Sequence, residues 1–419
     1  MEACIHHGAH EIGGSCVEVR SAGERIVLDV GRPLDSASDE KIPVIPLQDG
    51  ETPPLGVLIT HGHQDHWGLA DQVPAEVPVF MGAATERILR EASFWTRGME
   101  RSDIRHLEHR VPFDLGPFRI TPFLNDHSAF DAYSLLVESD GARLFYTGDI
   151  RGHGRKRDIF EELLRKPPTG VDVMLMEGTH IGTEDEREDP QGSEDAVEDA
   201  CAETFKSAKG VGLAIFSAQN IDRLVTIYRA TLRADRDFVM DLYTAGIAEA
   251  TGNPNIPRPS EAWPRVKVYV PGWQRIRVKE AGAFERVDRI RPFRLFEEDL
   301  AADPAHYVMS FGRTSAPALK RAGALDGAVA VWSMWEGYLK EPSGLALQAF
   351  LADRGIPLVR HHTSGHASVG DLKRLIESVK PTRVIPIHTF GGERLAELFP
   401  RVERRDDGEW WEVGGSRGA

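Results

Sequence analysis

Apolar and polar positions alternate in short runs along the first 180 residues, which is the pattern of half-buried β-strands. Residues 14–19 and 25–30 form one such pair around Ala22-Gly23 and predict an antiparallel hairpin. Further strands are expected at residues 55–59, 111–113, 118–124, 133–138, 143–147 and 171–176, and a helix at residues 84–93. Several of these strands end in an acidic residue or a histidine. Because active sites of layered α/β folds collect at strand ends, we expect one shared site there.

From Ser193 onward the pattern changes to alternating helix and strand, after an acidic connection at residues 182–192. Ser193 is suited to cap the helix that follows it, because its hydroxyl can accept from the free N–H groups of the first turn. Strands are expected at residues 211–216, 238–243, 265–270, 307–311 and 328–333, and a helix at residues 220–234. This order predicts a doubly wound α/β unit.

The last part of the chain returns to the character of the first. A strand-like run at residues 357–360 leads into a histidine-rich loop, and a strand at residues 383–387 ends on His388. A helix at residues 369–379 and a strand at residues 409–413 are also expected. We therefore predict an α/β protein in which an inserted domain, residues 186–355, interrupts one domain made of residues 1–185 and 356–419.

Composition narrows the class of protein. The hydrophobic content is 41% and the charged content 27%, as in a soluble globular enzyme. No run approaches the roughly 20 apolar residues that span a bilayer, so no membrane association is expected. The N-terminus lacks the basic and apolar regions of a signal peptide, and three cysteines without metal-type spacing predict reduced thiols. These features favour a cytoplasmic protein.

Charge is distributed unevenly along the chain. The net charge is −15, whereas nucleic-acid binders usually present a basic face. Residues 264–294, however, hold nine bases against three acids. We expect this segment to attract a polyanion, and Trp273 within it is a candidate for stacking on a base, although a structural role in the core is the alternative.

The strongest candidate chemistry lies in one turn, Thr60-His61-Gly62-His63-Gln64-Asp65-His66. Imidazole nitrogens and carboxylate oxygens are ligands for zinc and its neighbours. Four such groups within six residues cannot all face one side of a strand or helix, but a loop can divide them between two ions. This spacing predicts a metal site, against the alternative of a polar turn that is merely rich in histidine.

Histidines and acids at other strand ends complete a two-metal site. One ion is expected on His61, His63 and His127, and a second on Asp65, His66 and His388, with Asp149 between them. About three protein ligands per ion leave a position open, which is typical of catalytic sites. Two ions roughly 3.5–4 Å apart can generate a nucleophile and stabilise the attacking and leaving oxygens. Asp29 is expected to orient the metal-binding loop as an outer partner of the ligands, or else to be a plain turn aspartate.

These motifs resemble those of a known family. The histidine-rich turn, with His127, Thr147-Gly148-Asp149 and His388, resembles the metallo-β-lactamase superfamily, whose fold is an αββα sandwich. The inserted α/β unit and three strings of residues are similar to the β-CASP branch of that superfamily, and especially to ribonuclease J. These strings are Glu177-Gly178-Thr179-His180, Thr363-Ser364-Gly365-His366-Ala367-Ser368 and Val384-Ile385-Pro386-Ile387-His388.

The resemblance implies roles for further residues. It implies that His366 is the general acid beside the scissile phosphate, with Glu177 near it and Asp65 in the catalytic set. A histidine is well suited to protonate an alkoxide leaving group near neutral pH. Ser364 and Ser368, with the backbone around Ala367, are candidates for holding the substrate phosphate, although either serine can instead cap the following helix.

Our leading hypothesis is a metal-dependent nuclease that hydrolyses single-stranded RNA or DNA. A hydroxide bridging two divalent ions, zinc or alternatively manganese, attacks phosphorus, and His366 assists the leaving oxygen. A homodimer is the candidate assembly. Two alternatives remain open: a hydrolase of small esters, lactones or thioesters on the same fold, and a non-enzymatic subunit that binds nucleic acid. The basic segment favours a polyanion over a small ester, and the complete ligand set favours an enzyme.

Overall fold

The computed structural model describes residues 1–34, 36, 42, 44–47, 52–96, 99, 101, 103–190 and 192–414. The chain forms two compact units. Unit 1 comprises residues 1–90, 98–191 and 365–419, and unit 2 comprises residues 91–97 and 192–364. The predicted domain boundaries, 1–185, 186–355 and 356–419, stay a prediction.

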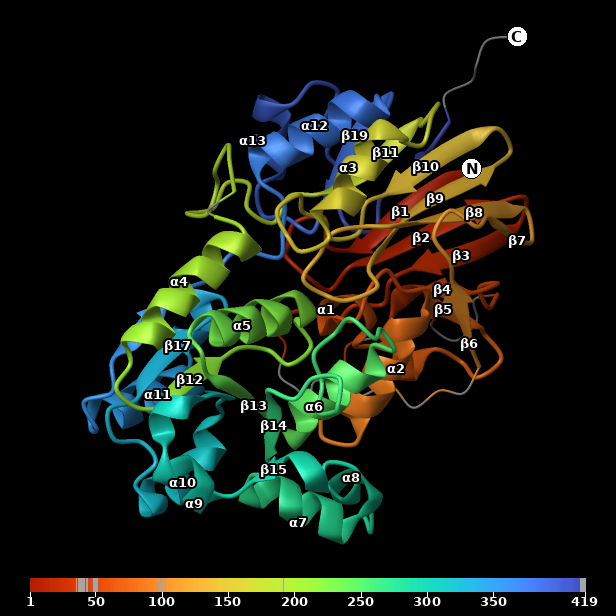
Figure 1. The fold of residues 1–419 in the computed structure, drawn as a ribbon. Coiled ribbons are helices and arrows are strands. Elements are labelled where there is room, and N and C mark those ends of the chain that lie inside the picture. The colour runs from red at the N-terminus through yellow and green to blue at the C-terminus, as the bar shows by residue number, and fades with distance from the viewer. Residues whose placement is uncertain are drawn as a thin grey trace. The chain divides into compact units, whose positions relative to one another are not determined.

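Unit 1 contains two mixed β-sheets (Figure 1). The first has the order β20-β1-β2-β3-β4-β5-β6, built from Trp410–Glu412, Glu2–His7, Cys16–Ser21, Glu24–Leu28, Val57–Leu58, Val79–Gly82 and Ile104–Leu107. The second has the order β19-β11-β10-β9-β8-β7, built from Arg383–Ile387, Val173–Glu177, Ala142–Tyr146, Tyr133–Ser139, Phe118–Leu124 and Phe113–Leu115. The helices of this unit are α1 Gln64–Trp67, α2 Ala83–Ser93, α3 Arg157–Arg165, α12 Val369–Val379 and α13 Gly392–Leu398.

Three buried clusters show that the two sheets lie between two layers of helix. The central cluster joins apolar side chains from both sheets, such as Val19 and Leu28 of the first and Leu135 and Leu144 of the second. A cluster behind the second sheet consists of Phe123, Leu136, Phe145, Phe160, Leu163, Met174, Leu372, Leu375 and Leu395, with residues of β8 to β11 and of α3, α12 and α13. A third cluster joins β3, β4 and β5 to α2 and to the turn that contains Trp67. The predicted αββα sandwich is confirmed.

The alternating pattern located most strands of unit 1 and missed others. The hairpin of β2 and β3 forms as expected, with Ala22 and Gly23 both at positive φ in its turn. Strands β1, β5 and β6 and helix α3 were not predicted. In β1 the reason is chemical: His6 is buried and its Nε2 lies 2.8 Å from Glu18 Oε2, so polar residues occupy positions that the pattern assigns to solvent. The expected strand at 111–113 is wrong for its first two residues, since β7 begins at Phe113.

Unit 2 is built on one seven-stranded sheet in which every pairing is parallel. Its order is β15-β14-β13-β16-β12-β17-β18, from Arg294–Leu295, Val266–Tyr269, Asp237–Asp241, Tyr307–Ser310, Gly212–Ile215, Val329–Trp332 and Leu358–Arg360. Its helices are α4 Glu194–Ser207, α5 Ile221–Arg233, α6 Leu242–Ala250, α7 Gly272–Glu280, α8 Glu285–Asp288, α9 Glu297–Ala302, α10 Ala316–Ala322 and α11 Pro342–Ala352.

Helices cover both faces of this sheet, as a doubly wound unit requires. Val239 of β13 lies in a cluster with Leu319 of α10 and Leu347 of α11. Its neighbour Phe238 points to the opposite face, where its ring packs edge-on against Tyr228 of α5. Ser193 caps α4 by accepting from Ala196 N, as predicted. The expected strand at 238–243 is wrong at its end, because α6 begins at Leu242 under the side-chain cap of Asp241.

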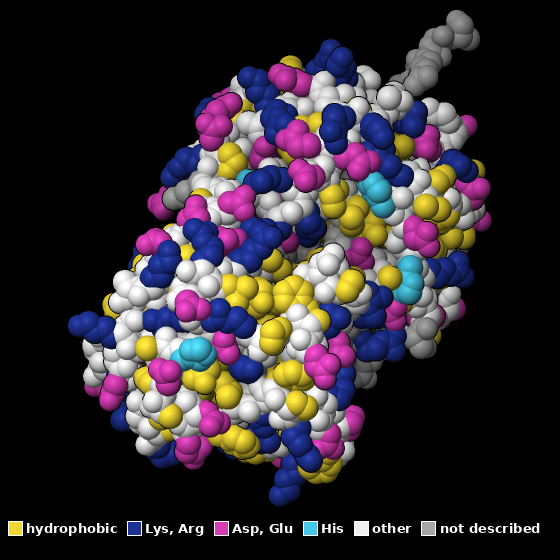
Figure 2. Space-filling model, in the orientation of Figure 1, with side chains coloured by type: hydrophobic (Ala, Val, Ile, Leu, Met, Phe, Trp, Pro, Cys, Tyr) yellow, Lys and Arg dark blue, Asp and Glu magenta, His cyan; other side chains and the backbone are white. Residues whose placement is uncertain are grey.

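The basic segment at residues 264–294 is less positive than its own composition suggests. Four of its arginines pair with carboxylates that lie outside the segment in sequence: Arg265 with Asp235 and Asp237, Arg275 with Glu297, Arg286 with Glu91, and Arg289 with Glu249. On the face of the protein in Figure 2, positive and negative side chains are interspersed. The local excess of bases is therefore largely neutralised by the fold.

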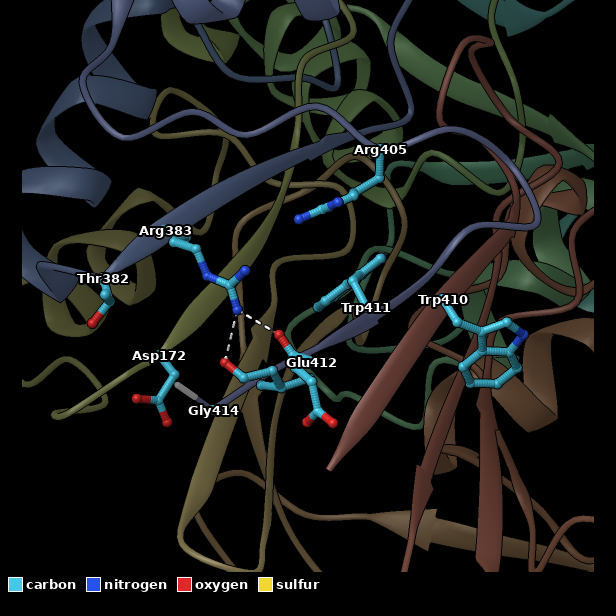
Figure 3. A pocket seen from close by; sticks show the side chains of 9 residues that line it. Asp172, Thr382, Arg383, Arg405, Trp410, Trp411, Glu412 and Gly414 are labelled. Carbon is cyan, nitrogen blue, oxygen red and sulfur yellow. Dashed lines mark hydrogen bonds between the residues drawn. The ribbon is translucent and has the colours of Figure 1, made fainter. Parts of the chain in front are cut away.

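A cavity of about 520 Å³ lies in unit 1, lined by residues of the two edge strands β19 and β20 and their neighbours (Figure 3). The guanidinium of Arg383 donates to the carbonyl oxygens of Glu412 and Val413, and so occupies acceptors that the edge strand β20 leaves exposed. None of the predicted site residues lines this cavity. Among the described residues, no helix is both long and apolar enough to cross a membrane.

Candidate metal centre

The predicted ligands stand where strands of unit 1 end. Strands β10, β11 and β19 are mutually parallel neighbours, so their carboxyl ends meet at one edge of the second sheet. Asp149 follows β10, Glu177 is the last residue of β11, and His388 follows β19. His127 follows β8, which is separated from β10 by β9 and runs in the same direction as β10, because β9 is antiparallel to both. The shared direction of β8, β10, β11 and β19 therefore gathers side chains that are up to 261 residues apart in sequence, counting from His127 to His388.

The first sheet contributes the histidine-rich turn after β4. His61 and His63 precede α1, and His63 occupies its N-cap position with extended backbone. Asp65 and His66 lie within the single turn of α1. This change from extended to helical backbone divides the four side chains into two pairs, as the sequence predicts for a loop.

The seven side chains form two groups that share Asp149. Asp149 Oδ2 lies 3.6 Å from His61 Nε2 and 3.8 Å from His127 Nε2, and His63 Nδ1 lies 3.2 and 3.1 Å from the same two nitrogens. Asp149 Oδ1 lies 3.3 Å from His66 Nε2 and 3.8 Å from His388 Nε2. Asp65 Oδ2 completes the second group, 3.1 Å from His388 Nε2. Each group has donor atoms within 4.8 Å of one another.

The polar atoms at the centre of these groups lack protein partners. Both carboxylate oxygens of Asp149 and Nε2 of His66 are buried and have no hydrogen-bond partner in the structure. Buried polar groups are normally satisfied, so each such atom requires an explanation. Four imidazoles directed at one buried carboxylate suit a pair of cations. The buried His/Asp groups fit a binuclear metal site.

The protonation states of the first group also fit metal binding. Burial lowers the pKa of His63 to about 4. Burial and neighbouring histidines hold the pKa of His61 well below its usual value, and burial does the same for His127. These imidazoles are therefore neutral near pH 7, and neutral imidazole is the form that coordinates a metal.

A partner on the other ring nitrogen orients several of these histidines. His127 Nδ1 lies 2.6 Å from the carbonyl oxygen of Gly365, His388 Nδ1 lies 2.9 Å from Thr179 Oγ1, and His61 Nδ1 lies 3.1 Å from Thr60 Oγ1. These contacts leave Nε2 of each ring directed at the centre of the site. Such partners are common behind metal ligands, where they fix the tautomer and the ring orientation.

Gly365 makes one of these contacts because it has no side chain. A Cβ at this position would stand 2.7 Å from Ser128 Oγ and 3.2 Å from His127 Cε1. The backbone of residue 365 can therefore approach His127 closely enough for its carbonyl to accept from the ring. This explains the glycine within the string Thr363-Ser364-Gly365-His366.

Asp29 contacts the histidine turn and the ring of His66, in agreement with the expectation that it supports the metal-binding loop. Its carboxylate accepts from Thr60 N at 2.7 Å and from Tyr146 OH at 2.8 Å, and its Oδ2 lies 2.8 Å from His66 Nδ1. The residue is fully buried and adopts positive φ, 58°, which aspartate tolerates better than most residues. Asp29 therefore links the histidine turn to β10, the strand that Asp149 follows.

Asp29→Asn is expected to weaken divalent-metal affinity by about 10- to 100-fold, because an amide holds the ring of His66 less firmly and lowers its basicity. Titration of the chelator-stripped protein with Zn²⁺, followed by calorimetry, measures this. Asp140→Asn is the control, since Asp140 is an exposed aspartate that also has positive φ. Equal affinities for Asp29→Asn and the native protein would show that Asp29 has no orienting role.

His366 and Glu177 lie together beside Asp149. His366 Nδ1 is 3.3 Å from Glu177 Oε2, 3.8 Å from Asp149 Oδ2 and 3.1 Å from Thr179 Oγ1. Burial lowers the pKa of His366, but the carboxylates of Glu177 and Asp149 outweigh burial and raise the pKa to about 9. Without bound cations, the ring is therefore protonated at neutral pH, and the side chain is 20% exposed.

The three candidate substrate-binding residues have different surroundings. The hydroxyl of Ser368 caps α12 by accepting from Asp371 N, so the capping alternative is realised in the structure. Ala367 is buried, with its N–H 3.5 Å from Glu177 Oε1. Ser364 is half-buried and is the last residue of unit 2. A phosphate-binding role for these residues stays a prediction.

Two residues of the site were not identified from the sequence. The hydroxyl of Thr179 contacts both His366 Nδ1 and His388 Nδ1, and Tyr146 anchors Asp29. Thr179 stands two residues after Glu177 in a string already singled out, so its position was an available signal. Tyr146 is the last residue of β10 and reads as an ordinary apolar strand residue.

Comparison with known proteins identifies the fold family. Residues 26–209 match a family profile described as "Beta-lactamase superfamily domain", and residues 359–395 match one described as "Zn-dependent metallo-hydrolase RNA specificity domain". The chain belongs to the metallo-β-lactamase superfamily. The second match covers His366 and His388, so it includes the part of the site that the last segment of the chain contributes.

Within the superfamily the chain is similar to ribonuclease J. It is 22% identical to "Ribonuclease J" of Corynebacterium glutamicum over 91% of this chain and 52% of that protein. It is also 22% identical to "Ribonuclease J" of Helicobacter pylori, over 91% of this chain and 55% of that protein. The chain thus spans about half the length of the curated relatives it matches. The predicted resemblance to ribonuclease J is confirmed.

A solved structure of similar length supports the fold. A protein of unknown function from Enterococcus faecalis superimposes with a TM-score of 0.77 at 19% identity. The match covers 98% of this chain and 99% of that one. At this identity the likeness shows the fold alone, including both a sandwich and an inserted parallel sheet.

Proposed function

We propose that this protein is a metal-dependent phosphodiesterase that hydrolyses single-stranded RNA. The observation that carries the proposal is the Asp149 carboxylate, which is buried, has no hydrogen-bond partner and is faced by histidines on both sides, with His366 Nδ1 3.8 Å away. Similarity to ribonuclease J and the match to an RNA specificity domain support RNA as the substrate class. Single-stranded DNA is the related substrate to be tested alongside RNA.

The residues that would hold two ions are His61, His63 and His127 on one side and Asp65, His66 and His388 on the other, with Asp149 shared. Divalent ions at these positions would lower the pKa of water and neutralise charge on phosphoryl oxygens. Zinc is the ion we expect, because the donors are mainly imidazole and the matched domain is described as zinc-dependent. Manganese is the alternative, since His/Asp sites accept both.

The chain's own groups then have distinct tasks. Asp149 fixes the spacing of the two histidine groups, and Asp29, Thr179 and the carbonyl of Gly365 hold the histidine rings in orientation. His366 donates a proton to the oxygen that leaves phosphorus, since an alkoxide is otherwise a poor leaving group. Glu177 keeps that proton on His366 through the 3.3 Å contact to its ring. Glu177 is itself held by the backbone N–H of Ile150 at 3.0 Å.

The test uses protein stripped of metal with a chelator and reloaded with Zn²⁺ or Mn²⁺. End-labelled single-stranded RNA and DNA, and a small ester and a lactone, are offered to the reloaded protein and to His63→Ala. We expect cleavage of RNA that depends on metal and is lost in His63→Ala. Hydrolysis of the ester or lactone without cleavage of RNA would overturn the proposal in favour of a small-molecule hydrolase. Absence of any metal-dependent hydrolysis would favour a binding subunit.

A further inference from the structure

Phe390 has an unusual combination of exposure and rigidity. Among the large hydrophobic side chains of the described residues it is the most exposed, at 69%. Single exposed hydrophobic side chains are common and usually need no explanation. Phe390 differs because its backbone neighbours are buried, Thr389 fully so.

The loop that carries Phe390 is fixed on both sides. Thr389 Oγ1 donates to the carbonyl of Gly178 at 2.7 Å and accepts from Gly391 N at 2.9 Å. The backbone of Gly391 lies so close to Ile181 that a Cβ would stand 2.1 Å from its carbonyl oxygen. The N–H of His388 donates to Gly8 at 2.7 Å. An apolar ring is thus presented to solvent from a backbone that is held by buried contacts on both sides.

This loop adjoins the candidate site. Phe390 follows His388 by two residues, and consecutive Cα atoms are about 3.8 Å apart, so the two Cα atoms are within roughly 7.6 Å. The loop that carries Phe390 contacts the segment from Gly178 to Ile181 through Thr389 and Gly391. This segment contains Thr179, which contacts His366 and His388. A nucleotide whose phosphate lies at His366 and His388 therefore has its neighbouring base within reach of an aromatic ring.

We propose that Phe390 is a stacking platform for a nucleobase adjoining the phosphodiester that is cleaved. The inference rests on the proposed function and deepens it, because it makes the substrate a nucleic acid recognised by a base and not only by its backbone. Stacking requires a flat apolar face and an open side, and Phe390 offers both on a backbone that is held by its buried neighbours. Every base has such a face, so this contact favours single-stranded substrates without selecting a sequence. Paired bases are already stacked and cannot use it.

Kinetics of three variants test the inference. Stacking of one base on an aromatic ring corresponds to roughly a 5- to 150-fold effect on binding. Phe390→Ala and Phe390→Leu are expected to raise KM for single-stranded RNA within that range, while Phe390→Trp keeps it near the native value. Leucine is the informative variant, because it stays apolar and loses only the ring.

A second substrate separates stacking from a general disturbance of the site. A phosphodiester that joins two abasic riboses has neither a base nor an aromatic ring, and its turnover is expected to be the same for the native protein and for Phe390→Leu. RNA with one abasic ribose, placed in turn at each position around the cleaved bond, completes a cycle. The native protein should lose affinity when one particular base is missing. Phe390→Leu should bind this abasic RNA as tightly as it binds intact RNA, because the two changes remove the same contact.

The outcomes distinguish the inference from the proposed function. If the native protein cleaves RNA and Phe390→Leu matches it, the stacking role is wrong and the proposed function stands. Equal losses on RNA and on the base-free diester would show a structural role for Phe390 and also overturn the inference. If the native protein cleaves the small diester but no RNA, the proposed function fails and the stacking role fails with it.

Discussion

Asp149→Asn is expected to reduce RNA cleavage by about 10³-fold or more and to lower metal content from two ions per chain to at most one. The amide has nearly the shape of the carboxylate but no charge, and only one of its two atoms can coordinate a cation. In the native protein each oxygen would be available to one ion, because Oδ1 faces His66 and His388 and Oδ2 faces His61 and His127. Metal analysis of dialysed protein and steady-state cleavage of labelled RNA measure the two effects.

Asp172→Asn is the matched control for Asp149→Asn. Asp172 directly precedes β11 and accepts from Arg143 N at 2.9 Å, so it lies at the end of that strand opposite to Glu177. It should keep native metal content and activity. Two retained ions and full activity in Asp149→Asn would contradict a shared carboxylate and would require a different bridge between the two groups.

The histidine turn could be predicted from sequence because its information is local. Four ligand-type side chains within six residues, at the end of an apolar run, restrict the structure strongly. The other ligands could be assigned because parallel strands place their carboxyl ends at a common edge. The sandwich and the doubly wound sheet followed from two different alternation patterns, each of which reflects which faces of a strand are buried.

Contacts between distant polar residues could not be predicted in this way. The Asp29 carboxylate reaches Tyr146, which is 117 residues away, and nothing in the pattern around either residue marks the pair. The same limit applies to β1, where the buried pair of His6 and Glu18 replaces an apolar contact. A pattern of hydrophobic positions cannot show that a polar side chain is buried with its partner.

The basic segment shows that counting charges along the sequence can mislead. Within residues 264–294 the bases outnumber the acids, but Arg286 pairs with Glu91 from a segment far earlier in the chain, and Arg289 pairs with Glu249. The potential at a surface depends on all the charges near it, including those that folding brings in. The proposed recognition of RNA therefore rests on the metal groups, His366 and Phe390 more than on this segment.

His366→Ala is expected to lower kcat for RNA by about 10²- to 10⁴-fold while both ions remain bound. The reason is that His366 stands 3.8 Å from Asp149 but is outside the two metal groups that share it, so its loss removes a proton donor and no ligand of those groups. A diester with a p-nitrophenolate leaving group needs little protonation, so its cleavage should fall by less than about 10-fold. Comparing the two substrates separates the loss of proton donation from a loss of substrate positioning.

His180→Ala is the matched control, because its ring centroid lies 6.0 Å from that of His366 and burial lowers its pKa to about 4, which leaves it neutral. A neutral imidazole donates a proton to an alkoxide far less readily than a protonated one, so His180→Ala should affect the two substrates alike. If His366→Ala slowed both substrates equally with metal content unchanged, the role of His366 would be to bind or position the phosphate. If metal content fell as well, His366 would belong with Glu177 and His388, with which it also forms a group of ligand atoms.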